Sequence, residues 1–229
     1  MDEDKFRFFT KIYSNIDVKP LLGEIVDNED LWLVNTSRQD KNKVQENTQG
    51  ITLRGAVPRP DLKIWENQES LETSAMRRFP KISEFLYGFA EAKSSKLSRA
   101  KIVRLKPGLP VGMHTDKGSY YLIRNRFHLV LKSTNGSILQ SGDEIVTMKE
   151  GELWWFDNKQ HHSALNNSTD WRIHVIFDLL PIANEELATN PVPLRDIGKK
   201  AHLQDYLRVI PIRVASLVDN NEIENPHEH

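Results

Sequence analysis

Between residues 99 and 180 the sequence breaks into short, closely spaced segments that have the pattern of β-strands. Apolar and polar side chains alternate in 124–132 and again in 171–179, as in strands with one buried face. Glycine and proline turns separate these segments, and this combination is typical of two packed sheets. The expected strands are 100–105, 124–132, 137–140, 145–148, 152–157 and 171–179, with a hairpin turn at Asn135 and Gly136. We therefore predict a mainly β chain folded as a double-stranded β-helix, or jelly roll.

The residues on either side of this run are expected to support it. The pattern predicts a short helix over 5–16, strands over 31–34 and 51–56 with a polar loop between them, and an amphipathic helix over 80–90. Helices before the strands would cover one sheet. We expect one domain with a support region at 1–98, a catalytic core at 99–180 and a C-terminal segment at 181–229. That last segment is polar and expected to be partly helical, with Leu203, Leu207, Ile210 and Val214 as packing residues.

The composition limits the possible partners. A chain of 229 residues with a net charge of −1 has no overall attraction to polyanions, so nucleic acid and anionic membranes are not expected partners. The absence of cysteine excludes disulfides, cysteine-bound zinc and iron–sulfur clusters. The acidic N-terminus is not followed by an apolar run, and no stretch is apolar for long enough to span a bilayer. We expect a soluble, cytoplasmic protein, with a homodimer as an open alternative.

Candidate metal ligands lie in two places. His114 and Asp116 are one residue apart, so in an extended segment both side chains point to the same side. His161 and His162 are adjacent and point to opposite sides, so one of the two is the expected second imidazole. Two imidazoles and one carboxylate can occupy one face of a metal and leave the other face open, which is the donor set of non-haem Fe(II) oxygenases.

Two of the expected strands carry the same polar motif. Arg126 and His128 share one face of their segment, and Arg172 and His174 share one face of theirs. We expect these two stripes to line one polar cavity that binds carboxylates. The fork geometry of Arg172 suits bidentate pairing with the far carboxylate of an organic-acid cosubstrate.

The sequence also resembles a known family. The run HTDKGSYYLIRNRFHLVLKST, followed by GELWWFDNKQHHSALNNSTDWRIHVIFDL, resembles the aspartyl/asparaginyl β-hydroxylase family of Fe(II)/2-oxoglutarate dioxygenases, and within it the branch of bacterial free-proline cis-4-hydroxylases. The resemblance covers about a third of the chain. The matching positions are Gly151, Glu152, Leu153, Trp154, Asp157, His162 and Arg172.

The resemblance implies a role for each of these polar residues. His114, Asp116 and His162 correspond to the Fe(II) ligands, and Arg172 to the residue that binds the distal carboxylate of 2-oxoglutarate. Arg126, His128 and His174 are assigned to cosubstrate or substrate contacts. In the animal enzymes of the family the carboxylate ligand is missing and the first histidine lies in the Arg-x-His strand, so His128 is the alternative first ligand. The presence of Asp116 favours His114.

The implied reaction couples 2-oxoglutarate and O₂ to the hydroxylation of a C–H bond in a small polar substrate, a free amino acid or a derivative. Hydroxylation of Asp or Asn side chains in a peptide or protein is the main alternative, and a non-catalytic jelly-roll binding protein is the second. A zinc hydrolase has no use for Arg172. A nucleic-acid dealkylase would need a second arginine six residues after Arg172, where this chain has Asp178.

Overall fold

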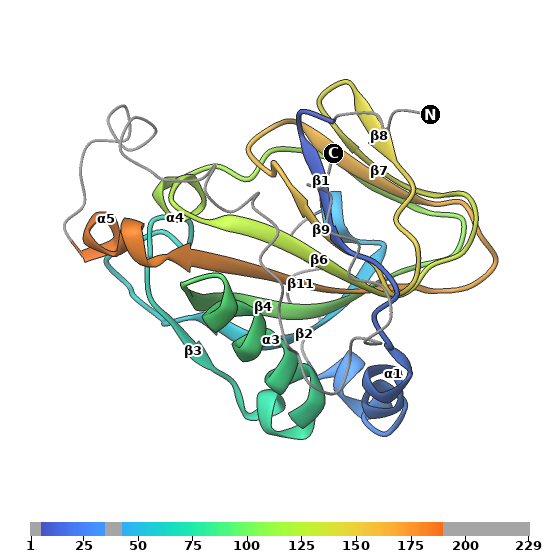
Figure 1. Ribbon diagram of the computed structural model, residues 1–229, viewed down its shortest axis with the longest axis horizontal. Coiled ribbons are helices and arrows are strands. Elements are labelled where there is room, and N and C mark those ends of the chain that lie inside the picture. Colours follow the sequence, from blue (N-terminus) through green and yellow to red (C-terminus); the bar gives the residue numbers. More distant parts are fainter. Residues whose placement is uncertain (1–5, 35–42, 190–229) are drawn as a thin grey trace, which may run out of the picture.

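Two antiparallel β-sheets face each other in the computed structural model, which describes residues 6–34 and 43–189 (Figure 1). The larger sheet has the strand order β1-β9-β6-β11-β4-β2-β3, and the smaller has the order β5-β10-β7-β8. The strands of the larger sheet are β1 (Phe9–Tyr13), β2 (Thr48–Ala56), β3 (Ser70–Glu72), β4 (Ser95–Leu105), β6 (Asn125–Lys132), β9 (Leu153–Phe156) and β11 (Arg172–Pro181). Those of the smaller sheet are β5 (Pro110–His114), β7 (Ser137–Ser141), β8 (Glu144–Val146) and β10 (His162–Asn166).

The chain passes back and forth between the two sheets from β4 onward. Strands β4, β6, β9 and β11 lie together in the larger sheet, and the intervening β5, β7, β8 and β10 make up the smaller one. This alternation is the winding of a double-stranded β-helix, so the predicted jelly roll is confirmed. Strands β1, β2 and β3 extend the larger sheet at its edges.

The turn at Asn135 and Gly136 has a different place from the one predicted. Gly136 has the positive φ of 95° that a tight turn requires, but the strands on either side belong to different sheets. The turn therefore carries the chain from β6 across to β7, and the expected hairpin is wrong. The Asn-Gly dipeptide predicts a turn from local sequence alone. Whether the two flanking strands pair with each other depends on the rest of the fold.

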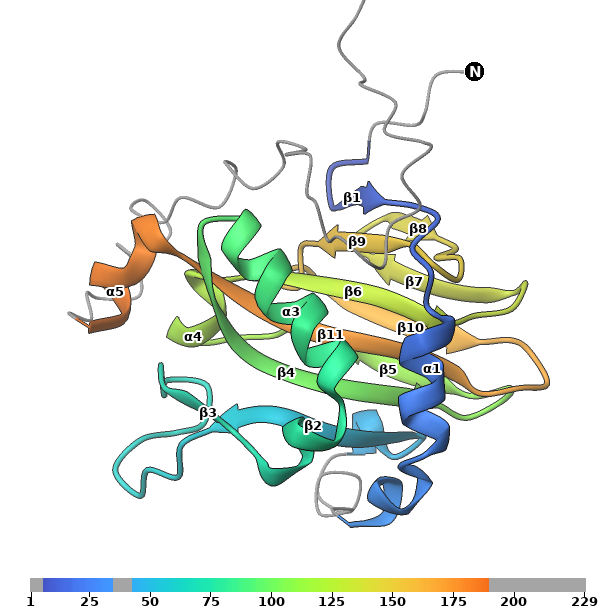
Figure 2. The ribbon, with the colours of Figure 1, turned by 60° about the horizontal axis from the view of Figure 1, so that its bottom comes forward.

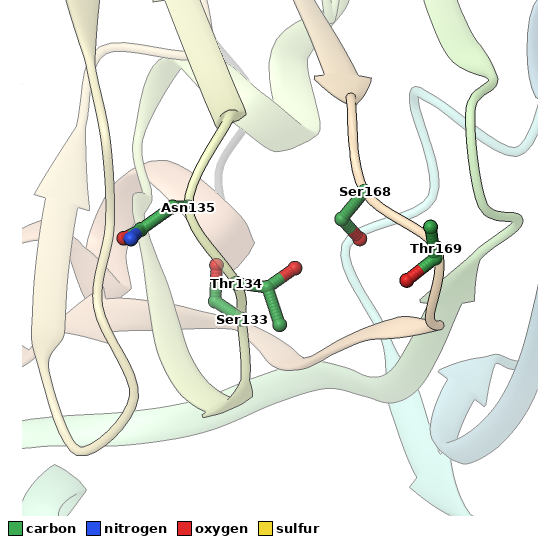
Figure 3. Close-up of a pocket in the computed structure, with 5 residues that line it drawn as sticks. All are labelled: Ser133, Thr134, Asn135, Ser168 and Thr169. Atoms are coloured by element: carbon green, nitrogen blue, oxygen red, sulfur yellow. The ribbon is translucent and has the colours of Figure 1, made fainter.

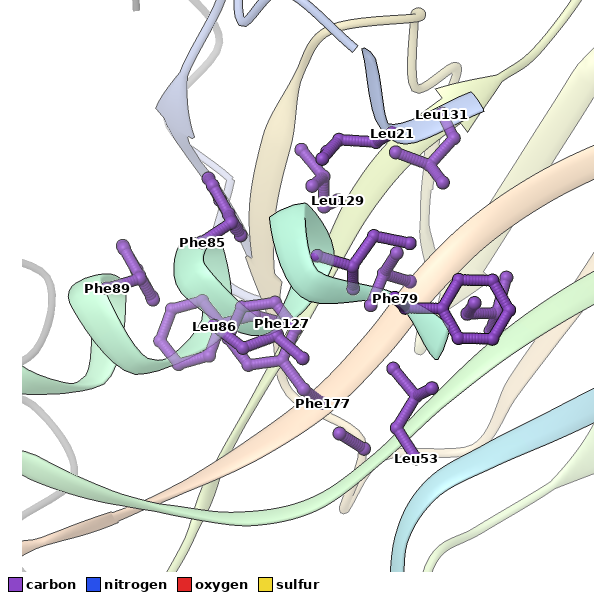
Figure 4. Packing of buried hydrophobic residues seen from close by; sticks show 14 of the residues in the cluster. Leu21, Leu53, Phe79, Phe85, Leu86, Phe89, Phe127, Leu129, Leu131 and Phe177 are labelled. Carbon is purple, nitrogen blue, oxygen red and sulfur yellow. The ribbon is translucent and has the colours of Figure 1, made fainter. Parts of the chain in front are cut away.

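Helices cover the outer face of the larger sheet (Figure 2). Helix α3 (Pro80–Ala92) begins at a proline and buries Ile82, Phe85, Leu86 and Phe89, as its apolar spacing predicts. The Phe89 ring packs edge-on against Phe127 of β6 at 5.1 Å and Phe177 of β11 at 5.7 Å (Figure 4). Helix α1 (Lys19–Val26) adds Leu21 and Ile25 to the same core.

Two N-terminal expectations are wrong. The predicted helix over 5–16 contains strand β1, because pairing with β9 satisfies the backbone at the edge of the sheet; Phe9 lies opposite Phe156. The predicted strand over 31–34 contains the end of a 3₁₀ helix, η1 (Glu29–Leu33). Trp32 is buried there, while Leu33 and Val34 are largely exposed, so no strand face forms.

The remaining elements are short. They are the 3₁₀ helices η2 (Lys43–Gln45), η3 (Ser74–Arg78) and η4 (Ile182–Asn184), and the helices α4 (Ser119–Leu122) and α5 (Glu185–Thr189). Leu203, Leu207, Ile210 and Val214 lie outside the described residues, as do 1–5 and 35–42. Among the described helices, none combines the length and the apolar character needed to cross a membrane. The division into 1–98, 99–180 and 181–229 stays a prediction.

Candidate metal and carboxylate site

A cavity of about 830 Å³ lies between the two sheets. Its floor is the inner face of the larger sheet, and the opposite face of that sheet packs against the helices. Side chains alternate along a strand, so each strand contributes to both faces. On β11, Ile173, Val175 and Phe177 belong to the helix-covered core. The residues that alternate with them line the cavity: Arg172, His174, Ile176 and Asp178.

Strand β6 contributes the neighbouring stripe. It pairs with β11 so that His128 lies opposite Ile176 and Arg126 lies opposite Asp178. Both Arg126 and His128 line the cavity, while Phe127, Leu129 and Leu131 face the helices. The expectation that the two Arg-x-His stripes share one cavity is therefore confirmed by their placement.

The predicted metal ligands come together across the smaller sheet. His114 is the last residue of β5 and His162 the first of β10, and the two are directly opposite in the pairing of these strands. Their ring centroids are 4.1 Å apart. Asp116 follows two residues later, and one ligand atom from each of the three residues lies within 4.8 Å of the others. His161 is exposed and is not part of this cluster.

Both imidazoles are oriented by backbone carbonyls. Nδ1 of His114 lies 2.8 Å from the carbonyl oxygen of Gly112, and Nδ1 of His162 lies 2.9 Å from that of Gln160. A carbonyl only accepts, so Nδ1 carries the proton in each neutral ring and Nε2 presents a lone pair. Burial lowers the pKa of His162 to about 4, which keeps this ring neutral at physiological pH.

Asp116 is held by a buried polar network. Its Oδ2 atom accepts hydrogen bonds from Nη1 of Arg126 and, at 2.9 Å, from Nδ2 of Asn158, and Arg126 is in turn paired with Asp178. Burial is the largest single effect and would raise the pKa of Asp116, but the charge of Arg126, together with His162, the Asn158 hydrogen bond and His114, holds the pKa well below its usual range. The carboxylate is therefore ionised and has a fixed orientation, with one oxygen engaged by protein donors.

Arg172 is a buried cation without an anionic partner. It is 8% exposed, and no carboxylate of residues 6–34 or 43–189 lies within ion-pair distance of it. Burial lowers its pKa to about 10, so the guanidinium stays charged at neutral pH. A buried charge that lacks a counterion is costly in an isolated protein. An anion bound in the cavity would supply the missing partner.

A line of contacts leads from Arg172 to the metal ligands. Its Nη2 atom lies 3.3 Å from Nδ1 of His174, which lies 3.2 Å from Nδ1 of His128. Since a guanidinium only donates, Nδ1 of His174 is an acceptor and its proton is on Nε2. The His128 ring then packs on Phe156, and Phe156 packs on His162. Burial, and after it the charge of Arg172, keeps the pKa values of both His128 and His174 well below the usual range.

His128, the alternative first ligand, is not a member of the cluster formed by His114, Asp116 and His162. Arg126 also differs from its expected role. Its guanidinium is engaged by Asp116 and Asp178, so it is not a free partner for a substrate carboxylate. Trp154 and Trp155 are both buried in hydrophobic clusters, and neither lines the cavity.

Sequence reasoning missed several residues of the site. Asp178 continues the alternating stripe of Arg172 and His174, and this period of two was a usable signal. Asn158 has no such signal, because it reaches Asp116 from a loop 42 positions away. Arg99 and Trp65 also line the cavity, and neither belongs to a recognisable motif.

A second depression lies away from this site (Figure 3). It is formed by the loops that follow β6 and β10, and its lining residues are Ser133, Thr134, Asn135, Ser168 and Thr169. All five are uncharged, and none belongs to the metal-ligand cluster. The histidines, arginines and carboxylates described above do not line this depression.

The chain is similar to several solved structures. A 2OG-Fe(II) oxygenase family oxidoreductase from Burkholderia pseudomallei has a TM-score of 0.44 and 12% identity, with 59% of this chain and 69% of that chain covered. AviO1 from Streptomyces viridochromogenes Tue57 has a TM-score of 0.46 and 10% identity, with coverage of 77% and 90%.

Sequence comparison gives closer similarity. L-proline cis-4-hydroxylase from Rhizobium meliloti (strain 1021) is 26% identical over 148 residues, which cover 63% of this chain and 52% of the relative. The match thus spans about half the length of that curated relative. The profile of the Aspartyl/Asparaginyl beta-hydroxylase family matches residues 33–181, more than half of the sequence and the region that contains the whole cavity floor. The chain therefore belongs to the aspartyl/asparaginyl β-hydroxylase family.

Proposed function

We propose that this protein is an Fe(II)- and 2-oxoglutarate-dependent dioxygenase that hydroxylates a C–H bond of a small, amino-acid-like substrate. One observation carries the proposal. His114 and His162, which cluster with Asp116, line the same cavity in which Arg172 lies buried without a carboxylate partner among the described residues. A metal-binding face and a lone guanidinium together suit a chelating organic acid with a second, distal carboxylate.

The donor set fits Fe(II). Two imidazoles whose Nδ1 atoms are engaged by carbonyls, which leaves each Nε2 for a metal, and one ionised carboxylate are the donors of a facial set that leaves positions for further ligands. Nothing in the cluster is a thiolate, and the chain has no cysteine. When bound, Fe(II) with 2-oxoglutarate and O₂ supplies the oxidative decarboxylation that is coupled to hydroxylation of the substrate.

The protein's own contribution is orientation and exclusion of water. The carbonyls of Gly112 and Gln160 fix the two imidazoles, and Arg126 with Asn158 fixes the carboxylate of Asp116. Arg172 would bind the distal carboxylate of 2-oxoglutarate with its fork of N–H donors. The His174 and His128 rings lie between Arg172 and the candidate ligands. Both rings are neutral, so they add no charge there.

The similarity to a proline hydroxylase supports an amino-acid-like substrate, as does the excess of cationic side chains in the cavity. The lining includes Arg54, Arg99, Lys101, Arg126 and Arg172 but only one carboxylate, Asp178. A peptide substrate is the second candidate, favoured by the family match. A cytoplasmic location and a homodimer stay predictions from the sequence.

The test is succinate formation by protein loaded with Fe(II) under anaerobic conditions and then exposed to O₂. The panel contains the proteinogenic amino acids and short peptides with an internal Asp or Asn, and product mass is measured for the gain of one oxygen atom. His162→Ala should abolish metal binding and turnover, while His161→Ala, the adjacent exposed histidine, should retain both. If the wild-type protein consumed no 2-oxoglutarate with or without substrates, the proposed function would be wrong.

A further inference from the structure

We propose, on the basis of the proposed function, that Arg99 binds the carboxylate of the substrate, and that the substrates are therefore small free carboxylic acids of the amino-acid type. Arg99 lies on β4, a strand that contributes neither a metal ligand nor the cosubstrate arginine. It lines the same cavity as the metal-ligand cluster.

The strand register separates Arg99 from Arg172. Arg172 of β11 lies opposite Leu105 of β4, and Arg99 is six residues further along β4 from Leu105. At about 3.3 Å per residue, the two backbones lie roughly 20 Å apart along the sheet. The two side chains therefore start near opposite ends of the paired strands, and we assign a separate acid to each.

Arg99 belongs to the end of the cavity where the metal ligands lie. The Tyr120 hydroxyl accepts a hydrogen bond from the backbone N–H of Arg99 at 3.0 Å and donates to Asp178 at 3.2 Å. Asp178 pairs with Arg126, which binds Asp116. An acid held by Arg99 therefore lies on the side of the cluster away from Arg172, where its carbon skeleton can approach the open face of the metal.

The guanidinium of Arg99 is held in place, but not all of its N–H groups are used in hydrogen bonds. Its Nη2 atom donates to the carbonyls of Ile64 and Asn67, and its charge lies 3.7 Å from the centroid of the Tyr120 ring. Its Nη1 atom makes no hydrogen bond within the part of the chain that the structure describes and is not buried, whereas Nε is buried and also has no partner there. No carboxylate of that part pairs with it either. A rigid cation with an unused N–H suits anion binding at little cost in side-chain entropy.

The other arginines at this end already have partners. Arg54 donates to the carbonyls of Ser98 and Ser70 and lies 3.8 Å from Glu72. Arg126 is paired with two carboxylates. Among the guanidinium groups that line the described cavity, Arg99 and Arg172 are those without a carboxylate partner. Two such cations match two acids, the cosubstrate and the substrate.

An apolar wall beside Arg99 suits the rest of a small molecule. Ile64 and Trp65 both line the cavity, and their loop is held to Arg99 through the Ile64 carbonyl and to Tyr120 through the Trp65 carbonyl. An internal residue of a peptide has an amide where a free acid has its carboxylate, so it could not pair with the charge of Arg99. Recognition of the carboxylate thus selects free acids over internal peptide residues.

The test compares acids with their amides. Binding of each proteinogenic L-amino acid, its amide and the dipeptide amide in which glycinamide follows it is measured by calorimetry, with Mn(II) and 2-oxoglutarate present and O₂ excluded. Wild-type protein should favour its best acid over the matching amide by about tenfold or more. Arg99→Gln should reduce this ratio toward one, and Arg99→Lys should keep part of it. Arg59→Gln, which removes an exposed arginine paired with Asp61, should leave the ratio unchanged.

Each outcome separates the possible roles. If Arg99→Gln weakened acid and amide equally, Arg99 would only hold the loop of Ile64 and Asn67, and the inference would be wrong. Binding of the dipeptide amide in preference to the free acid would also overturn it. Failure of every free acid to bind, with 2-oxoglutarate still converted to succinate, would reject the inference and leave the dioxygenase function standing. Arg99-dependent binding of an acid without any 2-oxoglutarate turnover would support the subsite and reject the proposed function.

Discussion

Asp178 binds Arg126 through both oxygens of its carboxylate, which accept hydrogen bonds from Nε at 2.8 Å and from Nη2 at 3.0 Å. This bidentate geometry leaves Nη1 of Arg126 to donate to Oδ2 of Asp116. Asp178 is 2% exposed, so water does not replace these contacts. The orientation of the candidate metal-binding carboxylate thus depends on a residue of β11 that does not itself belong to the cluster.

We expect Asp178→Asn to weaken metal binding by about 10- to 100-fold, because the neutral amide no longer fixes Arg126 and Asp116 is less firmly oriented. Anaerobic titration with Co(II), followed by visible absorption, measures the affinity. Asp30→Asn is the matched control, since Asp30 is exposed and pairs with Arg78, and neither residue belongs to the cluster or lines the cavity. An Asp178→Asn protein that bound Co(II) as tightly as wild type would show that the ion pair does not position Asp116.

Replacement of Arg172 should separate stability from cosubstrate binding. Arg172→Met removes a buried charge with no carboxylate partner in the described chain, so we expect the free energy of unfolding of the metal-free protein to rise by about 1 kcal/mol. The same change should abolish the increase in Tm that 2-oxoglutarate produces in the Mn(II)-loaded wild type.

Arg172→Lys keeps the charge but loses the bidentate fork, and should raise the KM for 2-oxoglutarate about tenfold or more. Arg59→Met, at an exposed position, should change neither property. An unchanged KM in Arg172→Lys would remove Arg172 from the cosubstrate site.

The stability of the metal-free protein should fall as the pH is lowered from 6.5 to 5.5. Histidine in the unfolded chain titrates near pH 6.5, whereas burial holds the pKa values of His174 and His128 well below that. Between pH 6.5 and 5.5 the unfolded state takes up protons that the native state does not. The stabilisation associated with these neutral histidines is therefore fully present above pH 6.5 and decreases as the pH falls below it. Each such histidine contributes at most about 1.4 kcal/mol per pH unit.

Urea unfolding in the presence of a chelator measures this slope. His174→Gln should give a shallower dependence on pH than wild type, whatever its absolute stability. His161→Gln, at an exposed position, should give the wild-type slope. Equal slopes for His174→Gln and wild type would mean that the buried ring is protonated at pH 5.5.

Gly118 connects the segment of the metal ligands to the wall of the cavity. It has a φ of 110°, and a Cβ atom there would lie 2.5 Å from the carbonyl oxygen of Trp65. We expect Gly118→Ala to lower the free energy of unfolding by about 1 to 3 kcal/mol, because the backbone of the Trp65 loop has to move. Urea unfolding provides the measurement.

Gly88→Ala is the matched control, because a Cβ on this residue of α3 meets nothing within 4 Å outside its own helix. It should stabilise the protein by about 0.5 to 1 kcal/mol. If Gly118→Ala were as stable as wild type, the expected clash between its Cβ atom and the Trp65 carbonyl would be contradicted.

The alternation of side chains made the faces of β6 and β11 predictable. Burial of Phe127 and Phe177 and exposure of Arg126 and Arg172 to the cavity follow from a period of two, which is a local property of the sequence. Strands β5 and β10 were not predicted, because neither has a clean apolar stripe; β5 is largely exposed. They form because each finds a partner in the smaller sheet.

Residue types and spacing indicated His114, Asp116 and one of His161 and His162, and the family resemblance selected His162; the surroundings of the cluster could not be anticipated. A sequence shows that Arg126 is a cation on a polar stripe, but not which anion it meets. The fold supplies Asp116 and Asp178 as its partners, at separations of 10 and 52 positions. These partners were not considered when Arg126 was assigned to cosubstrate or substrate contacts. Among the cavity-lining arginines of the described residues at this end, Arg99 is the one without a carboxylate partner.

The direct opposition of His114 and His162 makes a bound metal a cross-link between strands. A metal held by both rings would join β5 to β10 across 48 positions of a chain that has no cysteine, much as a disulfide does elsewhere. Opening of the smaller sheet would then require release of the metal. Amide hydrogen exchange in β5 and β10 should consequently slow on metal loading, while exchange in the helix-covered strands β6 and β11 changes little.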